Sequence, residues 1–312
     1  MSANSSATNE SGSQYPEVRL CASTISFILL AFFNLVINFT IVSEERLRTQ
    51  ARFVLIFHML FSGLVYFCLS SVFYLQSYMR FEISKASCLT LITILMTSAS
   101  NILLTLTAMA LDRYIAICFP LKYSALCGKH RPWLLGAATW LLALLIPLYL
   151  VTQNTQPHYQ AKCTRAQMQD GQLFKILLIS FCTCLILYSY AKILIEERRI
   201  GVLNKRNHVG RKTILMHGAQ LAAYILPNFV LYFTYLLARA GYLDNKTKDL
   251  FGEVNFVFFS LAQCISPVIY GLRKEDLLEQ LYHKFPCLSC NLKGFLERMG
   301  RAASFGLCFH IR

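Results

Sequence analysis

The sequence predicts an all-α membrane protein in which seven helices cross the bilayer. Its residues are 55% hydrophobic and only 15% charged, a balance too apolar for an ordinary soluble domain. The charges also leave long gaps, each near the ~20 residues that a bilayer-spanning helix needs. Seven such helices with short connections leave no room for a second folded domain.

Five of the predicted spans carry no charge. In chain order they cover residues 20–43, 53–79, 86–111, 213–238 and 254–272. The two others cover residues 133–151, which include Pro147, and residues 171–191, which include Lys175 near one end. A lysine there can extend its side chain to the interface. We therefore expect an N-terminal segment over residues 1–18, a seven-helix domain over residues 19–272 and a tail over residues 273–312, with a short amphipathic helix directly after the last span.

The distribution of basic residues predicts the orientation. Most of the 30 Lys and Arg residues fall in segments that lie inside the cell if the N-terminus is outside, as the positive-inside rule requires. The net charge of +14 could suggest nucleic-acid binding. However, the basic residues are mostly juxtamembrane, so anionic lipid headgroups and an intracellular partner explain them better. We expect a glycosylated extracellular N-terminus, a cytoplasmic tail and no nucleic-acid partner.

Several residues are candidates for covalent modification. Asn4, Asn9 and Asn245 begin glycosylation sequons in segments predicted to lie outside. Residues 1–18 lack a basic start, so they are not predicted to be a cleavable signal peptide. Cys88 and Cys163 both fall in the predicted oxidising compartment and could be bridged. Cys287 and Cys290 follow the last span, where both acylation and unmodified thiols remain open.

Two motifs together resemble a known receptor family. The stretch LDRYIAICFPLKY (111–123) and the stretch SPVIYGLR (266–273) resemble the rhodopsin-like G-protein-coupled receptors. More narrowly, MALDRYIAIC, PLKY and the His217 of RKTILMHGAQL are similar to the odorant-receptor branch, and the whole chain is similar to the odorant-receptor-like proteins of fish. The resemblance implies a multi-pass plasma-membrane receptor without enzyme activity, cofactor or metal. It also implies a small odorant-like ligand and an intracellular heterotrimeric G protein as partners.

The resemblance assigns roles to individual residues. It implies a Cys88–Cys163 disulfide that pins the second outer loop over the third span. It also implies that Asp112 neutralises Arg113 while the cytoplasmic crevice is shut, because an unpaired guanidinium at the membrane boundary is costly. Pro227 and Pro267 should kink their helices. The full set for activation and coupling is Asp112, Arg113, Tyr114, Tyr190, Pro227, Pro267 and Tyr270.

The chain departs from the family at some of these places. In many relatives a second acid, on the sixth span, also holds the arginine. Here the matching place is near Asn207, inside a basic run, so the closed state is expected to rely on Asp112 and on packing. Ser62 and Ser266 stand where relatives carry an acid and an amide, so we expect no sodium site.

The predicted ligand pocket is apolar and aromatic. By resemblance it is lined by Leu95, Met96, Ala99 and Ser100 of the third span, Asn228, Phe229 and Tyr232 of the sixth, and Phe256, Phe259 and Ser260 of the seventh. No acid stands among them, so a small, mostly hydrophobic molecule fits better than an amine. A lipid or peptide receptor of the same fold remains an alternative. A transporter is less favoured, because the spans show no internal repeat.

Overall fold

The computed structural model describes residues 16–79, 81, 84–126, 131–153, 172–199, 222, 225–238, 240–267 and 275–285, and the regular elements in these ranges are all helices. In chain order they are α1 (Pro16–Phe33), the π-helical turn η1 (Asn34–Asn38), α2 (Phe39–Ser43), α3 (Glu45–Arg48), α4 (Ala51–Met79), α5 (Lys85–Cys118), α6 (Pro120–Leu126), α7 (Arg131–Gln153), α9 (Gln172–Arg199), a helix over Ile225–Ala238, α11 (Asn245–Ser266) and α12 (Glu275–Lys284). The helical class predicted from the sequence is confirmed.

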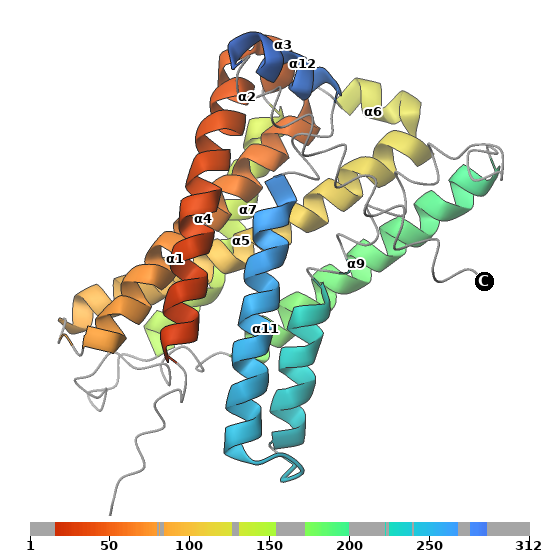
Figure 1. Cartoon of the computed structure of the whole chain (residues 1–312). Helices are drawn as coiled ribbons and strands as arrows, with labels where there is room; N and C mark the ends of the chain where they lie inside the picture. Colours follow the sequence, from red (N-terminus) through yellow and green to blue (C-terminus); the bar gives the residue numbers. More distant parts are fainter. Residues whose placement is uncertain are drawn as a thin grey trace, which may run out of the picture.

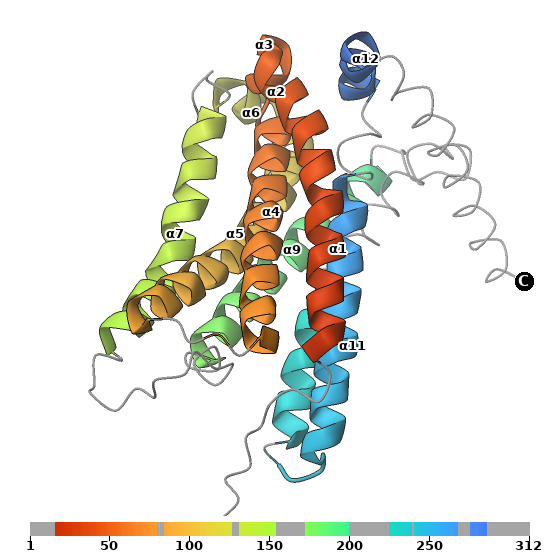
Figure 2. The ribbon, with the colours of Figure 1, turned by 60° about the vertical axis from the view of Figure 1, so that its left-hand side comes forward.

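The long helices form one bundle (Figures 1 and 2). Helix α1 runs beside α4 and α11, while α5 crosses the bundle obliquely and packs against α4, α7 and α9. The helix Ile225–Ala238 lies beside α11 in both views. We call the end of the bundle with the starts of α1 and α11 the outer end, and the end with α3 and α12 the inner end. The names follow the orientation that the charge pattern predicts.

The first span is one continuous apolar helix over Glu17–Ser43 that contains a π-helical turn. Two buried asparagines lie within this turn. Asn34 Nδ2 donates to the Leu30 carbonyl at 2.8 Å and to the Leu60 carbonyl of α4 at 3.0 Å, while Asn38 Nδ2 donates to Asn34 Oδ1 at 2.7 Å. A wider turn thus lets a buried amide join α1 to α4. Such turns are frequent at functional sites.

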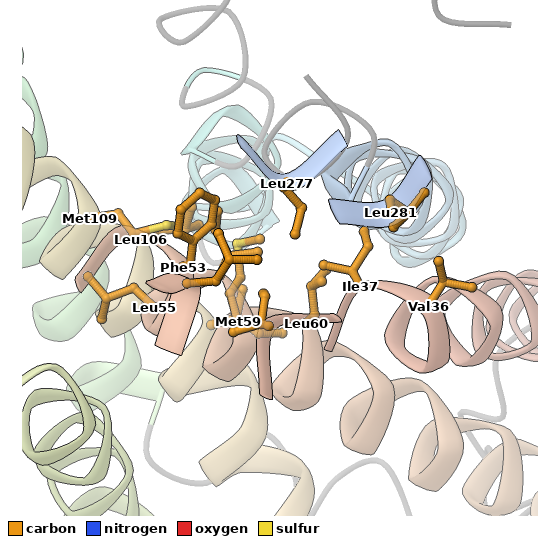
Figure 3. Packing of buried hydrophobic residues seen from close by; sticks show 14 residues of the cluster. Val36, Ile37, Phe53, Leu55, Met59, Leu60, Leu106, Met109, Leu277 and Leu281 are labelled. Carbon is orange, nitrogen blue, oxygen red and sulfur yellow. The ribbon is translucent and has the colours of Figure 1, made fainter. Parts of the chain in front are cut away.

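The inner half of the core includes the helix that follows the last span. Leu277 and Leu281 of α12 are fully buried and pack with residues of η1, α2 and α4. Figure 3 shows both leucines pointing toward Ile37. Lys284 lies on the same side of α12 by helical spacing, and its Nζ is 3.0 Å from Glu44 Oε1. The amphipathic helix expected after the last span is therefore present, and its apolar face is covered by the first two spans.

The helix ends differ from the ends of the uncharged runs. Helix α5 continues past Leu111 to Cys118, α9 continues to Arg199, and α11 begins at Asn245 rather than at residue 254. Charged residues end an apolar run without ending a helix, because the peptide hydrogen bonds continue into the interface. Five of the described helices are long and apolar enough to cross a membrane, and Ile225–Ala238 is a shorter apolar one. The division at residues 18 and 272 stays a prediction.

Candidate functional site

The motif of α5 lies at the inner end of the bundle. Asp112, Arg113 and Tyr114 are each half-buried, close to the last residue of the helix. At Phe119 the backbone leaves the helix, with φ −136° and ψ 59°. Pro120 then starts α6, a position that suits proline because the first helical N–H needs no partner. This turn brings α6 back toward the acid, and the Tyr123 hydroxyl donates to Asp112 Oδ1 at 3.1 Å.

Other charged groups surround this motif. The guanidinium groups of Arg113 and of Arg52 on α4 both act electrostatically on the Asp112 carboxylate. The Arg113 guanidinium also acts on the Glu197 carboxylate, which α9 contributes. Three helices thus bring charges to one place. The sequence motif identified Asp112 and Arg113 but not Arg52 or Glu197.

The two tyrosines assigned to the switch have different neighbours. The Tyr114 ring lies edge-on to Tyr188 of α9, with centroids 5.9 Å apart. Tyr190 instead packs against the buried pair Ala110 and Ile186, and Ile225 packs against the same pair. This cluster joins α5 and α9 to the helix Ile225–Ala238.

Both prolines assigned to the switch lie among the described residues, but each helix can be followed on only one side of its proline. Pro227 is buried near the start of the described part of its helix, and Pro267 is buried directly after α11. Tyr270 and the segment N-terminal to Pro227 that includes Asn207 and His217 lie outside the described residues. Both predicted kinks therefore stay predictions.

A neutral hydrogen bond joins α4 to α5 near the middle of the bundle. Ser62 Oγ accepts from Asn101 Nδ2 at 2.6 Å and donates to the His58 carbonyl at 2.7 Å. Both side chains are fully buried. Asn101 Nδ2 and Ser62 Oγ thus form an uncharged contact between the two helices, while Asn101 Oδ1 is buried with no hydrogen-bond partner among the described residues.

The predicted pocket residues of α5 and of the helix Ile225–Ala238 differ in how far they are buried. On α5, Leu95 and Met96 are buried, while Ala99 and Ser100 are half-buried. On the helix Ile225–Ala238, Asn228 and Tyr232 are half-buried and Phe229 is 44% exposed. A phenylalanine this exposed on an apolar helix is suited to contact lipid.

The α11 members of the predicted pocket pack toward α4. The Phe256 ring lies 5.7 Å from Tyr74 and 6.4 Å from Phe67, and the Phe259 ring lies 6.1 Å from Phe67. Ser260 Oγ donates to the Phe256 carbonyl at 2.8 Å, so its hydroxyl is used within its own helix. The structure therefore brings these residues together with the second span.

A buried ion pair at the outer end was missed by sequence reasoning. Arg19 Nε lies 2.5 Å from Glu253 Oε2, and Arg19 Nη1 donates to the Tyr74 hydroxyl at 3.0 Å. The guanidinium also lies 5.3 Å from the centre of the Phe256 ring. Both charged side chains flank uncharged runs at the predicted outer boundary. That shared depth is the signal that could have suggested a pair.

The remaining assignments concern modification sites. Cys88 is 5% exposed near the start of α5, and Asn245 is the first residue of α11. Asn4, Asn9, Cys163, Cys287 and Cys290 lie outside the described residues, so their roles stay predictions. Within the part of the chain that the structure describes, no group of His, Cys, Asp and Glu could hold a metal ion.

Comparison with known proteins decides the family. The profile described as "7 transmembrane receptor (rhodopsin family)" matches residues 33–270, well over half of the chain. The chain belongs to this rhodopsin-type receptor family. The receptor is 28% identical to the Homo sapiens "Olfactory receptor 2AT4", over 80% of the chain and 82% of that protein. It is 25% identical to the Homo sapiens "Probable G-protein coupled receptor 148", over 79% and 76%, and 25% identical to the Danio rerio "Odorant receptor 131-2", over 58% and 60%.

Membership of this family confirms the predicted class and localisation of the receptor. It is a G-protein-coupled receptor of the odorant-receptor branch and a multi-pass plasma-membrane protein, not an enzyme. The transporter alternative is thereby removed. The matched range begins beside Asn34 and ends at Tyr270, so it contains every residue assigned to the switch and the pocket.

Proposed function

We propose that the receptor binds a small, mostly apolar, odorant-like ligand between its helices and activates a heterotrimeric G protein through the inner end of α5. The names of its olfactory and odorant relatives support the ligand class. The observation that carries the coupling role is the half-buried Asp112–Arg113 pair, with Asp112 tied to Tyr123. These charges lie where a cytoplasmic partner would dock in the predicted orientation.

The geometry supports a simple cycle of partner exchange. In the resting receptor, the Arg113 guanidinium is compensated by nearby carboxylates, because an uncompensated charge at the membrane boundary is costly. A ligand that binds the open arrangement more tightly shifts the population toward it. Arg113 then exchanges its internal partners for the G protein. Tyr190 packs where α5, α9 and the helix Ile225–Ala238 meet, so movement of that helix would change its surroundings.

The charge arrangement favours neutral or weakly anionic ligands. Leu95 and its neighbours in the predicted pocket provide no carboxylate. Glu253, an acid at the outer end of α11, is already paired with Arg19. An ammonium group would therefore enter a low-dielectric site without a free counter-ion, which is strongly penalised.

A ligand screen in cells that deliver the receptor to the surface tests this function. Neutral and weakly acidic odorants should activate a G-protein reporter, while matched primary amines should not. At equal surface expression, Arg113→Ala should abolish the response. Activation by amines alone would refute the pocket. A wild-type response in Arg113→Ala would refute the coupling role, and activation only by peptides or long-chain lipids would favour the alternative receptor classes.

We also propose the topology and the processing expected from the sequence. The N-terminus lies outside, Asn4, Asn9 and Asn245 carry glycans, Cys88 pairs with Cys163, and the tail over residues 273–312 is cytoplasmic, with Cys287 and Cys290 available for acylation. Glycosidase treatment of the surface receptor should reduce its mass, and Asn4→Gln with Asn9→Gln should remove part of that shift. An epitope at the N-terminus that antibodies reach only after permeabilisation would refute the topology.

A further inference from the structure

Helix α9 packs against α5 (Figure 1), and one stripe of α9 faces that contact. Helical spacing places Ile186, Tyr190, Ile193 and Glu197 on this stripe. Ile186 is 1% exposed and clusters with Ala110 of α5, and Ile193 is 7% exposed. Glu197 continues this stripe toward the inner end, and the neighbouring Glu196 lies beside it, also half-buried. Along α5, Arg113 follows Ala110 in the same direction.

The Glu197 carboxylate is partly withdrawn from water. Its Oε2 atom is buried, and no hydrogen-bond partner for it is found among the described residues. A carboxylate oxygen in this position is penalised unless a nearby cation compensates it. The Arg113 guanidinium is the cation that acts on it. Glu197 in turn acts on Tyr190, two turns earlier on the same stripe.

Asp112 is not placed to hold Arg113 by itself. Neighbouring residues of a helix point about 100° apart, so the two side chains leave α5 in different directions. The Asp112 carboxylate also accepts the hydrogen bond from Tyr123 on α6. An acid on another helix is therefore needed on the Arg113 side. The sequence indicates none at the usual place near Asn207.

We propose that Glu197 of α9 positions the Arg113 guanidinium in the resting receptor, in place of the acid that many relatives carry on the sixth span. The inference rests on the proposed coupling role of Arg113. While Glu197 compensates the guanidinium, Arg113 stays against α9 and is unavailable to the G protein. Because the carboxylate interacts with Arg113 more strongly in this arrangement, Glu197 sets the resting population. This proposal adds a second acid to the expectation that Asp112 and packing hold the closed state, which stays a prediction.

Ligand-independent signalling at equal surface expression tests the role of Glu197. Glu197→Gln should raise basal signalling roughly fivefold, the change in population that the loss of one modest electrostatic interaction produces. Glu196→Gln is the matched control, because the neighbouring acid Glu196 lies 3.8 Å from the exposed Arg199 of its own helix and acts electrostatically on Cys118 of α5. It should leave basal signalling unchanged. Equal signalling in the two variants would overturn the inference.

A second measurement separates this inference from the coupling proposal. In purified receptor without G protein, the thermal midpoints of Arg113→Gln, Glu197→Gln and the double variant form a cycle. The two substitutions should be non-additive, while Arg113→Gln with Glu196→Gln should be additive. Additivity in both cycles would overturn the inference even if Arg113 couples to the G protein. If Glu197→Gln fails to reach the surface, Glu197→Asp replaces it and should give a smaller rise, and the absence of any rise would again overturn the inference.

Discussion

The two ends of the bundle hold their charges in different ways. At the outer end, the side chains of Arg19 and Glu253 are only 8% and 4% exposed, and Tyr74 accepts a further hydrogen bond from the guanidinium. At the inner end, Asp112 and Arg113 are half-buried; Asp112 accepts from Tyr123 of α6, and Arg113 acts electrostatically on Glu197 of α9. The outer pair is withdrawn from water, whereas the inner group keeps partial access to it.

This difference separates a fixed contact from a switch. A low-dielectric environment strengthens an ion pair and also raises the cost of leaving one member unpaired. Charges that keep access to water exchange partners at a cost of about 1 kcal/mol or less. The outer pair should therefore hold α1 against α11 in every state. The inner group can rearrange when a ligand or a G protein binds.

The largest expected effect comes from breaking the outer pair. Arg19→Ala leaves Glu253 as an unpaired buried carboxylate, and removal of one member of such a pair costs about 3–5 kcal/mol. We expect most of the variant to be retained inside the cell, and a markedly lower thermal midpoint for the fraction that folds. Surface labelling and thermal unfolding of purified receptor measure the two effects.

Two controls show whether burial of charge is the cause. The exchange Arg19→Glu with Glu253→Arg should recover part of the loss, because the charges are again paired. Glu196→Gln, which removes an exposed ion pair with Arg199, should cost close to nothing. If Arg19→Ala were as mild as Glu196→Gln, the outer pair would not be a fixed contact.

A neutral interface provides the next comparison. Gly136 of α7 lies so close to His58 of α4 that an added Cβ would overlap the imidazole ring. Gly136→Ala should therefore destabilise the receptor by about 1–3 kcal/mol, as overpacking of a core does. Adding His58→Ala should restore part of the loss by making room. A Gly136→Ala variant as unstable as Arg19→Ala would show that overpacking a neutral contact costs as much as leaving a buried charge unpaired.

The sequence predicted the helices better than their contacts. Long apolar runs identify spans because the bilayer leaves few alternatives for the backbone. The same runs placed the end of the third span at Leu111, although α5 continues to Cys118. The reason is that Asp112 and Arg113 interrupt hydropathy but not helical hydrogen bonding. The amphipathic α12 was predicted, but its ion pair with Glu44 required the fold.

The sequence predicted only those residues of the candidate site that belong to a short local motif. Asp112 and Arg113 were found from neighbouring letters of the sequence. Arg19 and Glu253 are separated by 234 positions, and no local pattern reports such a pair. Glu197 is one of two adjacent acids on an exposed-looking stretch. Both side chains are half-buried, and only the fold shows that Arg113 acts on Glu197 while Glu196 lies by Arg199.

At the inner end, loss of one hydrogen bond should change signalling more than stability. Tyr123→Phe removes the donor to Asp112 Oδ1, a loss of about 0.5–1.5 kcal/mol. If the bond is made mainly in the resting state, basal signalling should rise roughly two- to tenfold, while surface expression should stay near wild type. Asp112→Asn keeps an acceptor for Tyr123 but removes the charge, so it shows which property matters. Reduced expression without a rise in signalling would mean that this end is as fixed as the outer one.

The smallest expected effect lies at the outer end itself, at an exposed acid. Asp244 precedes α11, and its carboxylate accepts from the Thr247 N–H at 3.4 Å. A hydrogen bond from the Thr247 side chain, with smaller help from backbone N–H groups that include that of Thr247, holds the pKa of Asp244 below its usual value. The stability that the ionised cap contributes is therefore present above the ordinary aspartate pKa of about 3.9 and is lost as the pH falls through the lower folded-state value.

Asp244→Asn keeps a capping oxygen and leaves the Asn245 sequon intact, so at neutral pH its thermal midpoint should stay near wild type. Asp244→Ala should lower the midpoint slightly, and by far less than Arg19→Ala. Asp244 and Glu253 are both acids of the outer part of α11, but only Glu253 is buried and paired with Arg19. Equal losses of stability in Asp244→Ala and Arg19→Ala would therefore mean that burial does not set the cost of changing a charge there.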